Sequence, residues 1–156
     1  MRLALYQPDI PQNMGAMMRT AACLKVGIDV IEPCGFPFDE KRLRRAAMDY
    51  GEACEIVRHR SWETFLAQVR TDQRRLVLLT TATDVNHSDF TYRPDDTLLL
   101  GRESHGVPSD VHATVDACVR IPIATGLRSL NVSVAAAIVL AEGLRQLGYF
   151  AGKTEL

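Results

Sequence analysis

Several features that mark large classes of protein are missing from this sequence. None of its apolar runs approaches the about 20 residues that a helix needs to cross a bilayer, so we expect no contact with a membrane. Its 18 basic and 19 acidic residues give a formal net charge of −1, which excludes nucleic-acid binding through bulk positive charge. This balance still allows a local basic patch.

The cysteines form no metal or redox motif. The four are widely spaced and no C-x-x-C pair occurs, so we expect neither a zinc site nor any other metal. Three of them stand among apolar residues, where cysteine acts as a small core side chain. Because unpaired cysteines persist in a reducing compartment, the sequence predicts a cytoplasmic protein.

Common nucleotide-binding signatures are also missing, since neither G-x-G-x-x-G nor a Walker lysine pattern occurs. The chain instead alternates apolar segments of strand length and helix length. Strands are expected at residues 3–6, 28–32, 55–58, 76–80, 97–100 and 118–121. Helices are expected at residues 11–26, 39–50, 61–70 and 129–150, with another opening at Pro108. The pattern predicts one α/β domain over residues 1–156, built as a mostly parallel sheet flanked by helices.

In such sheets, ligands bind at the carboxyl ends of the strands. The first of these ends carries residues 8–15, P-D-I-P-Q-N-M-G, followed by Arg19. Pro11 and Asn13 are typical of a helix start, where the Asn13 side chain would cap unpaired amides. Arg19 is the only charge in an apolar run, and a buried guanidinium needs an anionic or carbonyl partner. Either a structural ion pair or a bound substrate group would meet that need.

The second end, residues 98–108, reads L-L-L-G-R-E-S-H-G-V-P. Gly101 and Gly106 would let the backbone approach a ligand closely, and Glu103 can accept hydrogen bonds from ribose hydroxyls or an amine. A loop with two glycines is more often an ordinary turn, so this segment alone points only weakly to a site.

The third end, residues 121–133, reads I-P-I-A-T-G-L-R-S-L-N-V-S and leads into the apolar run V-A-A-A-I-V-L-A. Ser129, Asn131 and Ser133 supply more polar groups than one helix cap needs, which suits a ligand pocket. A helix that is apolar all round must be buried on all sides. In a domain of this size, that requirement predicts a subunit interface and hence a homodimer.

Together these segments resemble the three signature motifs of the SPOUT methyltransferases, in the right order: P-x-I-P-x-N-x-G-x-x-x-R, G-x-E-x-x-G-V-P and I-P-I-x(5)-S-L-N-V-S. Residues 31–36 and 39–46 narrow the resemblance to the minimal branch that methylates the wobble ribose of tRNA, the tRNA (cytidine(34)-2′-O)-methyltransferases. The resemblance covers essentially the whole chain. Gly51, His105 and Ala141 depart from the usual pattern, all on the side expected to face RNA.

The resemblance implies a C-terminal trefoil knot, a homodimer and S-adenosylmethionine as the methyl donor. By the resemblance, Arg19, supported by Asn13, is the catalytic arginine beside the reacting ribose, where it would stabilise the oxygen as that atom gains charge or bind the adjacent phosphate. A plain general-base role does not suit it, because arginine stays protonated. Carried over by motif position, the expected cofactor contacts are Leu79, Gly101, Glu103, Ile121, Ser129, Leu130 and Asn131.

The expected RNA contacts come from local charge. Residues 41–75 hold nine of the 18 basic residues against five acidic ones, and K-R-L-R-R opens an expected helix, where cations are unfavourable. We therefore expect Lys41, Arg42 and Arg45 to bind phosphates of the tRNA anticodon loop. Two alternatives stay open: methylation of another tRNA position or of ribosomal RNA, and a nucleotide-binding module without catalysis.

Overall fold

The computed structural model describes residues 1–38 and 54–151. Within them, six strands form one sheet in the order β3-β2-β1-β5-β4-β6, and every neighbouring pair is parallel. The predicted mostly parallel α/β sheet is therefore confirmed. Its strands are β1 (Arg2–Tyr6), β2 (Gly27–Ile31), β3 (Ile56–His59), β4 (Arg75–Leu79), β5 (Asp96–Leu100) and β6 (Ala117–Val119).

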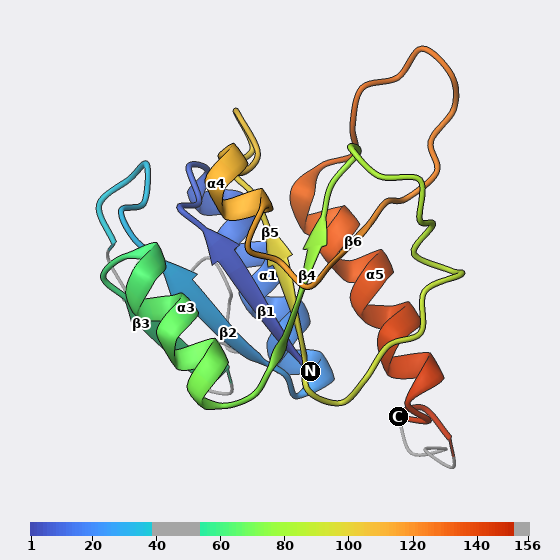
Figure 1. Ribbon diagram of the computed structural model, residues 1–156, viewed down its shortest axis with the longest axis horizontal. Coiled ribbons are helices and arrows are strands. Elements are labelled where there is room, and N and C mark those ends of the chain that lie inside the picture. Colours follow the sequence, from blue (N-terminus) through green and yellow to red (C-terminus); the bar gives the residue numbers. More distant parts are fainter. Residues whose placement is uncertain (39–53, 152–156) are drawn as a thin grey trace.

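Helices cover both faces of this sheet (Figure 1). α1 (Pro11–Leu24) and α5 (Val132–Gln146) pack against each other on one face, while α3 (Trp62–Thr71) and α4 (Ser109–His112) cover the other. Successive side chains of a strand point to opposite faces. In β1, Leu3 and Leu5 accordingly belong to the first core, whereas Ala4 and Tyr6 belong to the second.

Helix α1 begins at Pro11 as predicted, but its N-cap and its end differ from the prediction. Ile10 is its N-cap, Pro11 its first residue, and no side chain caps it, so the expectation that Asn13 caps this helix is wrong. Asn13 lies inside the first turn instead, where its amide can reach the neighbouring loops. The helix stops at Leu24 because Lys25 adopts a left-handed conformation with φ 54°, which closes the last turn.

Helix α5 is shorter than the expected span of residues 129–150. Asn131 is its N-cap, and the Asn131 side-chain oxygen accepts hydrogen bonds from the backbone N–H groups of Ser133 at 2.9 Å and Val134 at 3.3 Å. The chain leaves the helix at Gly148, which adopts φ 71°. Ser61 is the N-cap of α3. The helix expected at residues 39–50 lies outside the described residues.

The apolar run of α5 is not buried on all sides within one chain. Val139 and Leu140 are 0% exposed and belong to the core, but Val134 and Ile138 are 48% and 37% exposed. Val134, Ile138 and Leu130, which lies just before the helix and is 40% exposed, are spaced four residues apart, and we call them the exposed row. One chain therefore does not bury the helix completely, and burial of the exposed row at a subunit interface stays a prediction; such a row is typical of a protein interface.

The sequence also led us to expect no membrane span, no metal site and, through the resemblance, a C-terminal trefoil knot. No helix in residues 1–38 or 54–151 is long and apolar enough to span a membrane. The same residues contain no group of three His, Cys, Asp or Glu side chains that could hold a metal ion, and none of the four cysteines is in a disulfide. The trefoil knot that the resemblance implies stays a prediction.

Candidate functional site

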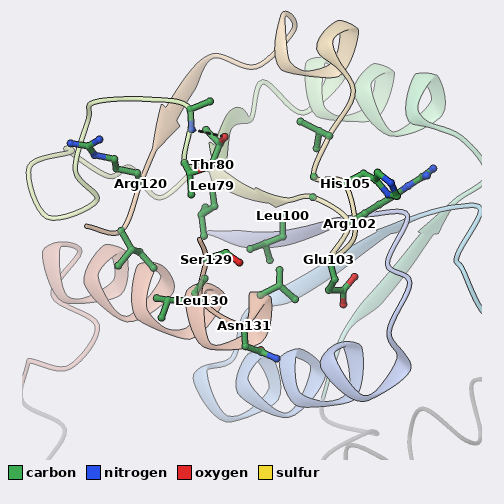
Figure 2. Close-up of a pocket in the computed structure, with 18 of the residues that line it drawn as sticks. Leu79, Thr80, Leu100, Arg102, Glu103, His105, Arg120, Ser129, Leu130 and Asn131 are labelled. Atoms are coloured by element: carbon green, nitrogen blue, oxygen red, sulfur yellow. Dashed lines mark hydrogen bonds between the residues drawn. The ribbon is translucent and has the colours of Figure 1, made fainter. Parts of the chain in front are cut away.

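A cavity of about 720 Å³ opens at the carboxyl ends of the strands (Figure 2). Its walls come from the loops that follow β1, β4, β5 and β6 and from the start of α5, which is where an open parallel sheet binds ligands. Its volume is in the range of small-molecule sites. We call it the strand-end pocket; it is lined by residues 10, 13, 79–82, 100–103, 105–107, 112, 119–121, 123, 129–132 and 135.

The centre of the strand-end pocket is apolar. In Figure 2, Leu79, Leu100 and Leu130 surround the cavity, and hydroxyl groups of Thr80 and Ser129 lie beside them. The Thr80 hydroxyl oxygen accepts a hydrogen bond from the backbone N–H of Ala82 at 3.1 Å, which fixes the turn after β4. Apolar walls with a few placed polar groups suit a flat, partly polar ring system.

The closed loop after β5 leaves room only for glycine at position 101. The backbone N–H of Arg102 donates to the carbonyl of Gly106 at 3.0 Å, and the N–H of Gly106 donates back at 2.9 Å. This closure is so tight that a Cβ on Gly101 would lie 2.6 Å from the carbonyl carbon of Gly106. The sequence predicted close approach of a ligand at Gly101, whereas the structure shows close approach of the chain to itself.

A reciprocal pair of acids joins the loops after β1 and β5. The backbone N–H of Asp9 donates to Glu103 at 3.2 Å, and the backbone N–H of Glu103 donates to Asp9 at 3.1 Å. Hydrogen bonding with Glu103 and Ser104 holds the pKa of the Asp9 carboxyl well below its usual range. Burial, together with the neighbouring Asp9, raises the pKa of Glu103. Asp9 therefore carries the negative charge, and Glu103 is the member that takes up a proton more readily.

Asn13 connects all three predicted segments. Its side-chain nitrogen donates to Glu103 at 3.0 Å, and its side-chain oxygen accepts from the side-chain nitrogen of Asn131 at 2.9 Å. Because Asn131 also caps α5, the three residues form a continuous relay from the loop after β5, through the first turn of α1, to the start of α5. Each side-chain oxygen of Glu103 has a partner within the protein, so Glu103 holds the loops in place.

The strand-end pocket gathers the residues predicted to contact the cofactor, all seven of which line it, and Asn13 lines it as well. Their roles stay predictions. Arg19 is placed elsewhere: it is exposed on α1 and does not line the pocket. The expectation of a buried guanidinium is therefore wrong, because Met17 and Met18 turn into the core and leave Arg19 outside. Lys41, Arg42 and Arg45 lie outside the described residues.

Other residues that line the pocket were not predicted from the sequence. Residues 80–82 directly follow β4, so the strand-end argument used for the other loops could have found them. Arg120 directly follows β6, where it pairs with Asp84 at 3.2 Å. Arg102 lies within the second predicted segment but was given no role. His112 had no local signal, because its place depends on how the four-residue helix α4 packs.

A parallel sheet with a strand-end pocket of this size defines a small-molecule-binding α/β protein. Comparison with known proteins makes the assignment more specific. Residues 1–141 match the SpoU rRNA Methylase family, and the chain belongs to that family.

Individual relatives cover nearly the whole chain. A tRNA (cytidine(34)-2′-O)-methyltransferase of Beijerinckia indica is 56% identical over 149 residues, which is 96% of this chain and 93% of that protein. The Escherichia coli K12 protein of the same name is 38% identical over 96% of this chain and 95% of its own length. A solved structure described as giving insights into the 2-OH methylation of C/U34 on tRNA superposes with a TM-score of 0.88 at 35% identity, covering 95% of this chain and 96% of that one.

A more distant structure holds a bound cofactor. The SpoU methyltransferase AviRb of Streptomyces viridochromogenes, solved in complex with AdoMet, superposes with a TM-score of 0.86 at 26% identity. The match covers 94% of this chain and 60% of AviRb. The structural similarity therefore extends to a family member with this cofactor bound.

Proposed function

We propose that the protein transfers a methyl group from S-adenosylmethionine to the ribose 2′-oxygen of the wobble pyrimidine, nucleotide 34, in the anticodon loop of tRNA. The observation that carries this proposal is that one pocket gathers residues from all three motif segments and that the Asn13 relay joins them. The relatives named above support the choice of substrate, because two of them, 38% and 56% identical over nearly the whole chain, carry the name of this activity.

The strand-end pocket fits an adenosine-containing cofactor. Leu79, Leu100 and Leu130 offer apolar surface for an adenine ring, and Ser129 and the neighbouring backbone offer polar contacts at its edge. The remaining predicted cofactor contacts are Gly101, Ile121 and Asn131 on the same walls, with Glu103 holding the loops. When bound, the cofactor supplies a methyl group that is already activated on a sulfonium.

The protein must then position the ribose and stabilise its oxygen as it gains negative charge. We assign this task to Arg19, whose exposed position on α1 is accessible to an RNA too large to enter the pocket. A planar guanidinium can present two parallel donors to an oxyanion or an adjacent phosphate. Lys41, Arg42 and Arg45 would add phosphate contacts in the anticodon loop.

We also propose a homodimer formed through the exposed row on α5. Leu130 belongs both to this row and to the strand-end pocket, so a second chain placed there would lie next to the site. The trefoil knot implied by the resemblance belongs to the same proposal. The tRNA substrate and four cysteines that form no disulfide are in keeping with a cytoplasmic protein.

Nucleoside mapping tests the substrate. Unmodified tRNA is incubated with the protein and S-adenosylmethionine, digested and analysed by mass spectrometry, with protein-free tRNA as the control. We expect a ribose 2′-O-methyl group on a pyrimidine at position 34. A methyl group on a base, or on a ribose outside the anticodon loop, would contradict the proposed substrate. The family description names rRNA methylases, so ribosomal RNA is the second substrate to assay.

A further inference from the structure

Arg102 stands out among the partly buried arginines because no carboxylate neutralises it. Four others have a carboxylate oxygen within hydrogen-bonding or ion-pair distance: Arg2 at 2.9 Å, Arg74 at 2.8 Å, Arg75 at 2.6 Å and Arg120 at 3.2 Å. Within residues 1–38 and 54–151, no carboxylate forms an ion pair with Arg102, although its side chain is also half-buried.

The guanidinium of Arg102 is held in a defined place. Its central carbon lies 5.7 Å from the centre of the Tyr6 ring, and Tyr6 is itself buried at the end of β1. The Nε atom of Arg102 is buried and has no hydrogen-bond partner. A partly desolvated cation with unused donors is unfavourable unless an anion binds to it. This position therefore favours the binding of a negatively charged ligand.

The loop that carries Arg102 places it at one end of the strand-end pocket. Two backbone hydrogen bonds between Arg102 and Gly106 close this loop, and Figure 2 shows Arg102 and His105 at the same end of the cavity, beside Glu103. Ser104 and His105 are exposed. This end of the pocket is therefore accessible to a macromolecule, whereas the apolar centre is suited to a small molecule.

We propose that Arg102 binds a phosphodiester group of the substrate RNA, next to the ribose that is methylated. The inference rests on the proposed function, which brings a nucleotide of a polyanion to this pocket. A planar guanidinium matches two phosphate oxygens. The contact adds a specific phosphate anchor at one end of the site, in addition to the RNA contacts expected from Lys41, Arg42 and Arg45.

Two matched variants test this contact. Arg102→Met keeps the aliphatic packing over Tyr6 and removes the charge, while Arg93→Met removes one charge from an exposed residue that does not line the pocket. The probes are an anticodon stem–loop RNA with cytidine at position 34 and, separately, S-adenosylhomocysteine. We expect Arg102→Met to weaken RNA binding about tenfold and to lower the salt dependence by about one phosphate contact. Its affinity for S-adenosylhomocysteine should stay within about twofold, and Arg93→Met should change neither affinity beyond that.

A modified RNA identifies the phosphate. One linkage beside nucleotide 34 is replaced by an uncharged methylphosphonate between 2′-deoxy nucleotides, and the matching 2′-deoxy phosphodiester serves as the control. At one of the two flanking linkages, we expect the replacement to weaken wild-type binding about tenfold and to leave Arg102→Met unaffected, since the two changes remove the same contact.

Other outcomes would overturn the inference. A loss of affinity for S-adenosylhomocysteine without a loss for RNA would assign Arg102 to the carboxylate of the cofactor. A lower thermal stability with both affinities unchanged would assign it a purely structural place over Tyr6. A wild-type protein that does not methylate nucleotide 34 contradicts the proposed function; an unchanged RNA affinity of Arg102→Met in a protein that does methylate it contradicts this inference alone.

Discussion

Asn13 joins the three parts of the strand-end pocket with a single side chain that must both donate and accept. It donates to Glu103 and accepts from Asn131. Alanine can do neither, and aspartate can only accept and would place a second carboxylate against Glu103. The two substitutions therefore separate the loss of the hydrogen bonds from the added charge.

We expect Asn13→Asp to lower the free energy of unfolding at pH 7 by about 2 kcal/mol more than Asn13→Ala does. Because the pKa of Glu103 is already raised, Glu103 takes up a proton as the pH falls and can then donate to the new aspartate. The difference between the two variants should therefore shrink on acidification. Urea unfolding at pH 7 and pH 5 measures it. If the two variants were equally stable at pH 7, the hydrogen bond that Asn13 donates to Glu103 would not stabilise the fold.

Arg19 allows a second prediction at the scale of one residue. Since Arg19 does not line the strand-end pocket, Arg19→Ala should leave the affinity for S-adenosylhomocysteine within about twofold of the wild type. Methyl transfer should fall by at least about a hundredfold, the size of effect expected when a donor to a developing oxyanion is removed. Calorimetry and a methyl-transfer assay measure the two quantities. Loss of cofactor binding would overturn the role given to Arg19.

The residues of the pocket were predictable wherever a polar loop follows an apolar strand, as at Gly101 and Ile121. The position of Arg19 was not predictable in this way. Helix α1 is apolar on nearly every face, so its sequence does not indicate which face packs against the core. Only the packing of Met14, Met17 and Met18 against the sheet decides that Arg19 faces outward.

At the scale of elements, an ionic network ties four parts of the sheet together. Asp29 on β2 is 1% exposed and accepts hydrogen bonds from Arg2 on β1 at 2.9 Å and from Arg74, just before β4, at 2.8 Å. His59 on β3 lies 2.8 Å from its other oxygen. Burial alone would raise the pKa of Asp29, but the hydrogen bonds from His59 and Arg74 and the charge of Arg2 hold it below its ordinary value.

Replacing this carboxylate should weaken the whole sheet. We expect Asp29→Asn to lower the free energy of unfolding at pH 7 by about 3 kcal/mol, because it removes the one buried counter-charge of Arg2 and Arg74 and leaves them only the exposed carboxylates of Glu55 and Asp72. Since the pKa is lowered in the folded state, the stabilisation is complete above the ordinary value of about 4 and is lost as the pH falls below it. The difference in the free energy of unfolding between wild type and Asp29→Asn should therefore decrease only below about pH 4.

Glu55→Gln is the matched control for this network. Glu55 contacts the same Arg2 at 3.0 Å, but its side chain is 67% exposed, so its loss should cost less than about 1 kcal/mol. Urea unfolding of both variants between pH 3 and pH 7 gives the comparison. An Asp29→Asn protein as stable as the Glu55→Gln protein at pH 7 would show that the network is not stabilising.

Strands and helices differ in how far the sequence could predict them. The central strands β1, β2 and β5 are buried nearly throughout, and their continuous apolar runs place them to within one or two residues. Helix ends depend on local conformations that composition does not reveal. Lys25 ends α1 with a positive φ, and α5 begins at Val132 with Asn131 as its N-cap, not at the predicted Ser129.

At the scale of the whole molecule, the exposed row lies beside the strand-end pocket. The row could not be predicted from sequence periodicity, because the helix is apolar on all its faces. Val139→Glu or Leu140→Glu would not test its role, since both residues are 0% exposed in the core and a charge there would unfold the chain itself. Val134 and Ile138 are suitable because each is already more than a third exposed.

We expect the wild-type protein to sediment with the mass of two chains at micromolar concentration, and the double variant Val134→Glu, Ile138→Glu to sediment with the mass of one. In a dimer, the two glutamates of one chain would face the two of the other. These like charges would repel one another, and they would lose water without gaining a counter-charge. Val85→Glu is the control, because Val85 is 44% exposed but lies outside the exposed row and should leave the dimer intact. Circular dichroism checks that the double variant keeps its fold. A monomeric wild type, or a dimer that survives both charges, would exclude α5 as the interface.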